Sequence, residues 1–141
     1  MSYLLYCVFR APLPAALKIP DGVAGNRVFT ANYDGLGAAL SKLPEPVALP
    51  DTQNLVAYER VVESFRRHLS VIPMRFGCWV SCAYDAVILL RENHDAYGSL
   101  LRDLEGLAKL GKQVRLDIPA PRAETDRPGF MRKWFPTRTN L

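Results

Sequence analysis

Tyr3-Leu4-Leu5-Tyr6-Cys7-Val8-Phe9 carries an apolar side chain at every position. Successive side chains of a β-strand point to opposite faces of a sheet, so this stretch is apolar on both faces. A strand that turns one face to water alternates apolar and polar residues instead. The stretch therefore predicts a central strand that is covered on both sides or nearly so.

A β-hairpin is predicted directly after this strand. Residues 27–33 and 36–43 favour extended structure, and Asp34-Gly35 between them is a two-residue turn signal. Prolines at positions 44, 46 and 50 then mark a loop.

Two amphipathic helices are predicted farther along the chain. Asp51 or Thr52 caps a helix that runs to about His68, and a second helix runs from about Ala83 to Leu104. Each has apolar positions at steps of three and four, the spacing of one packed helix face. In the first helix these positions are Leu55, Tyr58, Val62, Phe65 and Leu69; in the second they are Ala83, Val87, Leu90, His94, Tyr97, Leu101 and Leu104.

Two more strands complete the predicted fold. Residues 71–80 are apolar, with Pro73 near the beginning of the strand, and residues 112–118 alternate apolar and polar side chains. The order β, β, β, α, β, α, β predicts an α+β domain of a modified ferredoxin-like type. Its sheet is mixed but mostly antiparallel, and both helices are expected on one face. We expect this domain to span residues 1–118 and a basic tail, rich in proline and aromatic residues, to span 119–141.

Composition excludes several classes of protein. With 141 residues, 49% of them hydrophobic and 23% charged, the chain fits one globular domain. It has no apolar run near the ~20 residues of a membrane span and no secretory signal. Three cysteines fit a reducing compartment, so we expect a cytoplasmic protein. The net charge is +4, of which the tail carries +3, and the near-neutral body argues against a nucleic-acid-binding face.

The search for catalytic, cofactor-binding and metal-binding residues predicts none. Cys78 and Cys82 are spaced C-x3-C, but the chain does not offer the four compactly paired ligands of a zinc site. No phosphate-binding glycine loop is present. His94 lies on a helix stripe, which favours a histidine at the core edge that is hydrogen-bonded to a neighbour; the alternative is a general base.

An arginine interrupts the apolar segment Ile72-Pro73-Met74-Arg75-Phe76-Gly77. Alternation along a strand would put Arg75 and Gly77 on one face and Met74, Phe76 and Cys78 on the other. A guanidinium on a half-buried sheet face needs a carboxylate or carbonyl acceptor. We favour an internal tether for Arg75, and a contact to a partner or ligand is the alternative.

The stretch Val71-Ile72-Pro73-Met74-Arg75-Phe76-Gly77 resembles the hhPhRFG signature of the gas vesicle protein F and L family, in which h is a hydrophobic residue. Other segments are similar to that family in the same order: residues 3–8, 33–41, the helix with Tyr58, and the second helix with residues 109–116. The resemblance covers about residues 3–118. Cys78 and Trp79 stand where the family usually has threonine after RFG. Family members usually continue into a second, coiled-coil-like domain, so we expect the chain to correspond to their N-terminal domain alone.

The resemblance implies a minor gas vesicle protein with a modified ferredoxin-like N-terminal domain. Members of the family are cytoplasmic accessory proteins that associate with the small hydrophobic shell protein during vesicle assembly. The implied partners are the shell protein, other minor vesicle proteins, or both, with no catalytic activity, no cofactor and no nucleic acid. The alternative is a small ferredoxin-like ligand-binding domain or enzyme of unknown substrate.

Six residues are candidates for partner binding or for a structural role. The tail residues among them cluster between Pro128-Gly129 and Pro136, so we expect this segment to fold back on the domain or to dock on a partner. The oligomeric state is left open. The six candidates are Arg75, Phe76, Trp79, Phe130, Trp134 and Phe135.

Overall fold

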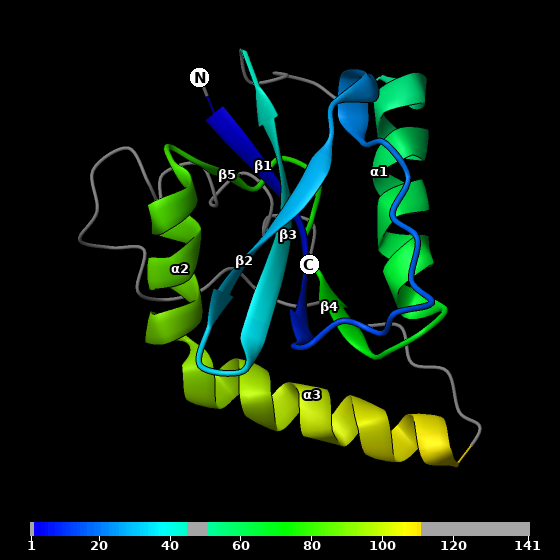
Figure 1. The fold of residues 1–141 in the computed structure, drawn as a ribbon, viewed down its shortest axis with the longest axis vertical. Helices are drawn as coiled ribbons and strands as arrows, with labels where there is room; N and C mark the ends of the chain where they lie inside the picture. Colours follow the sequence, from blue (N-terminus) through cyan, green and yellow to red (C-terminus); the bar gives the residue numbers. More distant parts are fainter. Residues whose placement is uncertain (1, 45–50, 111–141) are drawn as a thin grey trace.

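A computed structural model describes residues 2–44 and 51–110 of the chain (Figure 1). The predicted strand 112–118 and the tail, with Phe130, Trp134 and Phe135, lie outside the described residues. The elements in chain order are β1 (Ser2–Arg10), a 3-10 turn η1 (Val23–Gly25), β2 (Val28–Tyr33), β3 (Leu36–Leu43), α1 (Thr52–Arg66), β4 (Val71–Pro73), β5 (Trp79–Val80), α2 (Ala83–Glu92) and α3 (His94–Lys109). Within this part of the chain, no helix is long and apolar enough to cross a bilayer.

The strand β1 is the centre of a five-stranded sheet with the order β2-β3-β1-β4. β3 pairs with β1 along its whole length, and β4 and β5 pair with β1 on its other side. Every pairing among the described strands is antiparallel. The α+β class, the mostly antiparallel sheet and the central position of residues 3–9 are therefore confirmed; the ferredoxin-like label stays a prediction.

A β-bulge divides the side chains of β1 unevenly between two cores. The register of β1 on β3 shifts between Leu5 and Cys7, so Tyr6 and Cys7 face the same side. Leu5 and Val8 point into a core built with α2 and α3. Leu4, Tyr6, Cys7 and Phe9 point into a second core built with α1. Both faces of β1 are thus buried.

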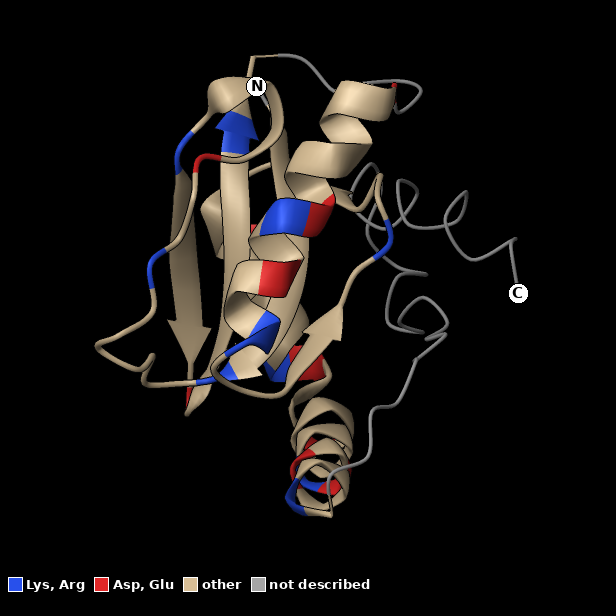
Figure 2. Cartoon of the chain, turned by 90° about the vertical axis from the view of Figure 1, so that its right-hand side faces the viewer, with Lys and Arg blue, Asp and Glu red and all other residues tan. Residues whose placement is uncertain are grey.

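The helices cover both faces of the sheet, which corrects the expectation that two helices share one face. α1 packs on one face through residues that include Tyr58, Val61 and Phe65. α2 and α3 pack on the other face through Leu89, Leu101 and their neighbours. Figure 1 shows α1 and α2 on opposite sides of the strands, and Figure 2 shows α1 lying over its face of the sheet. The physical reason is β1 itself, because a strand that is apolar on both faces needs an apolar cover on each.

The predicted second helix is two helices that meet at Asn93. The backbone of Asn93 leaves the helical region (φ −116, ψ 19), and its side-chain Nδ2 donates a hydrogen bond to the Leu89 carbonyl at 2.9 Å. A short polar side chain that bonds to a nearby carbonyl competes with helix continuation. The break lets α2 pack on β2 and β3 while α3 packs against β1 and β4. The prediction of a single helix over residues 83–104 was therefore wrong at its middle, whereas α1 starts at the predicted cap, with Asp51 Oδ1 accepting from the Asn54 amide at 2.7 Å.

Two buried tyrosines differ in how their hydroxyl groups are satisfied. Tyr6 Oη donates to Ser41 Oγ at 2.8 Å and accepts from the Val23 amide at 3.0 Å. The Tyr97 hydroxyl, buried in the other core, has no hydrogen-bond partner among residues 2–44 and 51–110. Burial raises the pKa of both groups, and the Cys78 thiolate form would raise that of Tyr97 further. An unpaired buried hydroxyl costs roughly 1–3 kcal/mol.

Replacing Tyr97 with phenylalanine is expected to raise the free energy of unfolding by about 1 kcal/mol at neutral pH, since the unpaired hydroxyl is removed. Because the pKa of Tyr97 is raised in the folded state, the unfolded chain loses that proton first as the pH passes about 10. Above about pH 10 the free energy of unfolding therefore falls as the pH rises, by up to about 1.4 kcal/mol per pH unit for this one group. Urea titrations of both proteins from pH 7 to 11 should show a shallower alkaline loss for the variant. Tyr6→Phe removes a hydrogen-bond partner from Ser41 and from the Val23 amide, so it should be less stable than wild type. A similar loss of stability in Tyr97→Phe would contradict the conclusion that the Tyr97 hydroxyl is unpaired.

Candidate functional site: the loop between β4 and β5

The segment that contains Arg75, Phe76 and Gly77 is a loop that interrupts one edge of the sheet. β4 pairs with β1 up to Pro73, opposite Cys7, and β5 resumes at Trp79, opposite Leu4. Five residues, 74–78, therefore span the distance that residues 5 and 6 span in β1. The single strand predicted over residues 71–80 is thus two short strands, and the alternation expected for Arg75 does not apply.

Backbone hydrogen bonds fix both ends of this loop to β1. The Met74 amide donates to the Tyr6 carbonyl at 2.9 Å, and the Leu5 amide donates to the Cys78 carbonyl at 2.9 Å. The loop lies beside the bulge of β1, where the register of β1 on β3 shifts. Gly77 closes the loop at φ +102, a conformation that side chains other than glycine rarely adopt. The Arg-Phe-Gly sequence therefore lies in a loop whose two ends are bonded to β1 and whose closing conformation requires Gly77.

Phe76 rests on a stack of aromatic rings that begins in the core. The Phe76 ring meets Tyr58 of α1 edge to face at 5.5 Å, and Tyr58 packs on Tyr6 at 5.4 Å. The Tyr58 hydroxyl donates to the Tyr6 carbonyl at 3.1 Å, next to the β1 bulge. Burial raises the pKa of Tyr58 well above its ordinary value, so it stays a neutral donor. One side chain of α1 thus supports both the bulge and the loop.

The structure places the predicted candidate residues in different environments. Trp79 is buried, at 4% exposure, in the core under α1, and Phe76 packs against the edge of the same core. Arg75 is half-buried, and its Nε is inaccessible to solvent. These three candidates lie together at the β4–β5 edge.

Arg75→Ala is expected to lower the melting temperature by several degrees, because a half-buried guanidinium in an anchored loop contributes packing as well as charge. Arg75→Lys keeps the positive charge but loses the planar guanidinium with its several donors. Its melting temperature should therefore lie between those of wild type and Arg75→Ala. Thermal unfolding followed by circular dichroism measures both. If Arg75→Ala melts like wild type and loses only a partner, Arg75 is a binding residue and not a tether.

A shallow pocket of about 360 Å³ lies between the β2–β3 turn and α3. His94 Nε2 is 2.9 Å from the Asp34 carbonyl oxygen and 3.3 Å from its carboxylate, and the ring meets Tyr33 edge to face. Arg10 pairs with Glu105 of α3 at 3.0 Å. The prediction of a hydrogen-bonded histidine at the core edge is confirmed. Sequence reasoning missed the Arg10–Glu105 pair, for which residues 95 positions apart give no local signal.

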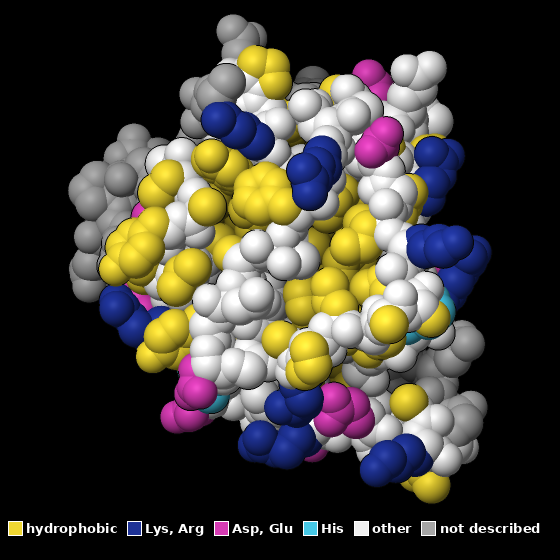
Figure 3. Space-filling view, viewed as in Figure 1, with side chains coloured by type: hydrophobic (Ala, Val, Ile, Leu, Met, Phe, Trp, Pro, Cys, Tyr) yellow, Lys and Arg dark blue, Asp and Glu magenta, His cyan; other side chains and the backbone are white. Residues whose placement is uncertain are grey.

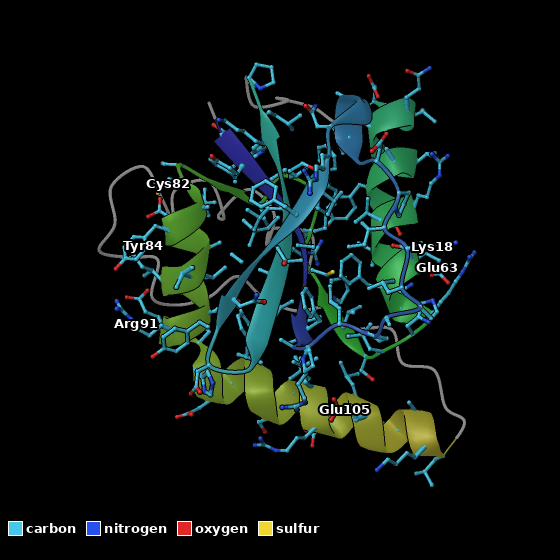
Figure 4. All side chains as sticks on the ribbon, viewed as in Figure 1. Lys18, Glu63, Cys82, Tyr84, Arg91 and Glu105 are labelled. Atoms are coloured by element: carbon cyan, nitrogen blue, oxygen red, sulfur yellow. The ribbon has the colours of Figure 1, made fainter. Side chains whose placement is uncertain are left out.

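The described residues hold no cluster of histidine, cysteine and carboxylate groups that could bind a metal ion. Cys7 and Cys78 are buried and Cys82 is exposed. Burial raises the pKa of the Cys7 thiol, which keeps it protonated and chemically inert. Figure 4 shows Cys82, Tyr84 and Arg91 along the side of α2 that faces away from the sheet.

Two solved structures share this fold. The chain superimposes on the crystal structure of the gas vesicle protein GvpF from Anabaena sp. PCC7120 with a TM-score of 0.63 and 24% identity, and on that of GvpF from Microcystis aeruginosa with a TM-score of 0.64 and 22% identity. Each match covers 74% of this chain and 44% of the other chain. The α+β domain described here is therefore an arrangement that GvpF proteins also contain.

Sequence comparison assigns the family. The model of the family "Gas vesicle synthesis protein GvpL/GvpF" matches residues 2–127, so the chain belongs to the GvpL/GvpF family, which implies association with gas vesicles. Gas vesicle protein F1 of Halobacterium salinarum (strain ATCC 700922 / JCM 11081 / NRC-1) is 30% identical over 98 residues, which are 67% of this chain and 46% of that protein. The chain thus spans less than half the length of the relatives that it matches.

Proposed function

We propose that the chain is a non-enzymatic, cytoplasmic assembly factor for gas vesicles that binds the small hydrophobic shell protein or another minor vesicle protein. The observation that carries this proposal is the family match over residues 2–127. Because the chain spans less than half of its relatives, the proposal concerns what this domain does by itself. Residues 1–118 act as the binding domain, and the segment 119–141 packs on it or on the partner.

The surface of the domain fits a binding role better than a catalytic one. Three of the polar groups that line the shallow pocket are already engaged, because His94 bonds to Asp34 and Arg10 pairs with Glu105 of α3. A catalytic site needs polar groups that converge on an open position. Large apolar side chains are exposed at several places: Leu55 and Val56 on α1, Tyr84 on α2, and Leu110.

Co-purification tests the proposal. The tagged chain is co-expressed with the shell protein, and separately with each other minor vesicle protein of the same organism, and captured complexes are analysed by size-exclusion chromatography with light scattering. We expect a stoichiometric complex with at least one of them. A matched control is the tagged chain with an unrelated small hydrophobic protein. The absence of a specific complex with any vesicle protein would overturn the proposal.

The alternative function, a small ligand-binding domain, would use the pocket beside His94. It is favoured only by the pocket's volume and by Arg102, which lines it. Thermal-shift screening with anionic metabolites decides between the two functions. Stabilisation that is abolished by Arg102→Ala, in a protein that captures no vesicle component, would favour the ligand-binding alternative.

A further inference from the structure

The outer edge of β2 has no neighbouring strand among the residues that the structure describes. Among the described strands β2 pairs with β3 alone, so it ends the described part of the sheet on that side. Figure 1 shows β2 in front of the other strands, at the edge nearest the viewer. An edge strand of this kind presents a row of backbone groups to whatever lies beside it.

The hairpin geometry identifies the groups on this edge. A two-residue turn, Asp34-Gly35, connects the facing residues Tyr33 and Leu36, and both turn residues have positive φ. In such a hairpin the pair next to the turn exchanges hydrogen bonds, and the pairs alternate from there. Phe29, Ala31 and Tyr33 therefore bond to β3. The amide and carbonyl groups of the alternate residues point away from β3; these residues are Val28, Thr30 and Asn32.

No backbone hydrogen bond within the described part of the chain engages the outward groups of Val28, Thr30 or Asn32. β2 also lacks the features that usually protect an edge. It is six residues long, it contains no charged residue and no proline, and its register on β3 has no bulge. Figure 3 shows hydrophobic side chains gathered over this edge between α1 and α2. The edge is therefore built to accept a strand.

Charges at the two ends of β2 define the chemistry of that strand. Arg27 and Lys42 flank the facing pair Val28 and Ser41, so both cations lie at the beginning of β2. Both are exposed, and neither has an ion partner in residues 2–44 and 51–110. At the other end Asp34 is engaged by His94. A strand alongside β2 is best matched by an uncharged middle and an acidic side chain near Arg27 and Lys42.

We infer that the free edge of β2 is a strand-addition site that takes an extended, uncharged segment of a partner protein, with an acidic residue at the end beside Arg27 and Lys42. The inference rests on the proposed function, in which the shell protein supplies this segment. Main-chain hydrogen bonds to Val28, Thr30 and Asn32 give affinity, and the half-buried Phe29 and Tyr33 beside them extend the apolar contact.

Amide hydrogen exchange followed by NMR tests the site residue by residue. The labelled chain is measured alone and in its co-purified complex with the shell protein. We expect exchange at Val28, Thr30 and Asn32 to slow by at least about tenfold in the complex, because their amides gain acceptors. Phe29, Ala31 and Tyr33 should be protected in both samples. A complex in which the three outward amides exchange as in the free chain would overturn the inference and leave the proposed function standing. Failure to bind the shell protein would overturn the inference, and only failure to bind every vesicle protein would overturn the proposed function as well.

Variants of the edge give a second test. Thr30→Pro removes an outward amide without touching the β3 ladder, and Thr30→Val keeps that amide as the matched control. We expect at least about tenfold weaker binding of the shell protein for Thr30→Pro and near wild-type binding for Thr30→Val. If Thr30→Pro does not fold, the double variant Arg27→Glu/Lys42→Glu, which changes only exposed charges, should weaken binding by a similar factor. Unchanged binding in a folded edge variant would overturn the inference.

Discussion

Replacing Tyr58 with alanine is expected to lower the free energy of unfolding by about 3–5 kcal/mol, the range for deleting a buried aromatic ring. Tyr58 is 3% exposed, packs on Tyr6 and Phe76, and hydrogen-bonds to the Tyr6 carbonyl. Its loss removes the support of both the β1 bulge and the Arg75–Gly77 loop. Urea denaturation followed by circular dichroism measures the change.

Tyr58→Phe is the matched control for this prediction. It keeps the ring contacts and removes only the hydroxyl donor, so it should cost about 0.5–1.5 kcal/mol. The loop provides a separate readout, because Phe76 loses its edge-to-face partner only in Tyr58→Ala. Exchange of the Met74 and Cys78 amides, which donate to the Tyr6 and Arg75 carbonyls, should then speed up in the alanine variant well before global unfolding. Equal costs for the two variants would contradict the role given to the ring.

Leu89→Ala is expected to cost about 2–5 kcal/mol, because Leu89 is fully buried between α2 and the sheet. Tyr84→Ala on the same helix is the control: Tyr84 is 62% exposed, and its loss should change stability by less than about 0.5 kcal/mol. Both values come from urea titrations under the conditions used for Tyr58→Ala. A small effect of Leu89→Ala would mean that α2 does not cover the second face of β1.

The elements that could be predicted from sequence are those that local signals define. The unbroken apolar run of residues 3–9 indicated a strand buried on both faces, and Asp34-Gly35 indicated the turn of the β2–β3 hairpin. The cap at Asp51 indicated where α1 begins, because the side chain and the helix amide that it binds are three residues apart.

The features that sequence reasoning missed depend on contacts between distant segments. Pro73 and Gly77 are local signals that are compatible with a loop in residues 71–80, but they do not require one. The bulge that the loop faces lies in β1, about seventy positions earlier. Asn93 is a local signal for a helix break, but an asparagine within a helical pattern does not by itself decide between a break and a continuous helix. The different surfaces that α2 and α3 cover are seen only in the folded domain. The expectation that both helices share one face also conflicted with the two-sided burial of β1, which the same sequence indicated.

The sequence identified the residues of the candidate site but did not predict that they form a loop. The arginine within an apolar segment, and then the resemblance, drew attention to residues 72–77, and the structure places Arg75 and Phe76 with Trp79 at the β4–β5 edge. The outward edge of β2 drew no attention, because an uncharged strand gives the same pattern whether or not a neighbour covers it. Only pairing and register reveal that edge.

The central place of β1 has a consequence for biosynthesis. Residues 2–10 leave the ribosome before the rest of the domain, yet their cover on the two faces comes from α1 and from α2 and α3, which end as late as Lys109. At roughly 5–20 residues per second, translation leaves this strand unshielded for several seconds. During that time it is a short, strongly β-forming peptide whose only charged side chain is Arg10, the kind of nascent segment on which holding chaperones act. Yield in cells should therefore depend on how fast residues 11–109 are translated as well as on the stability of the finished domain.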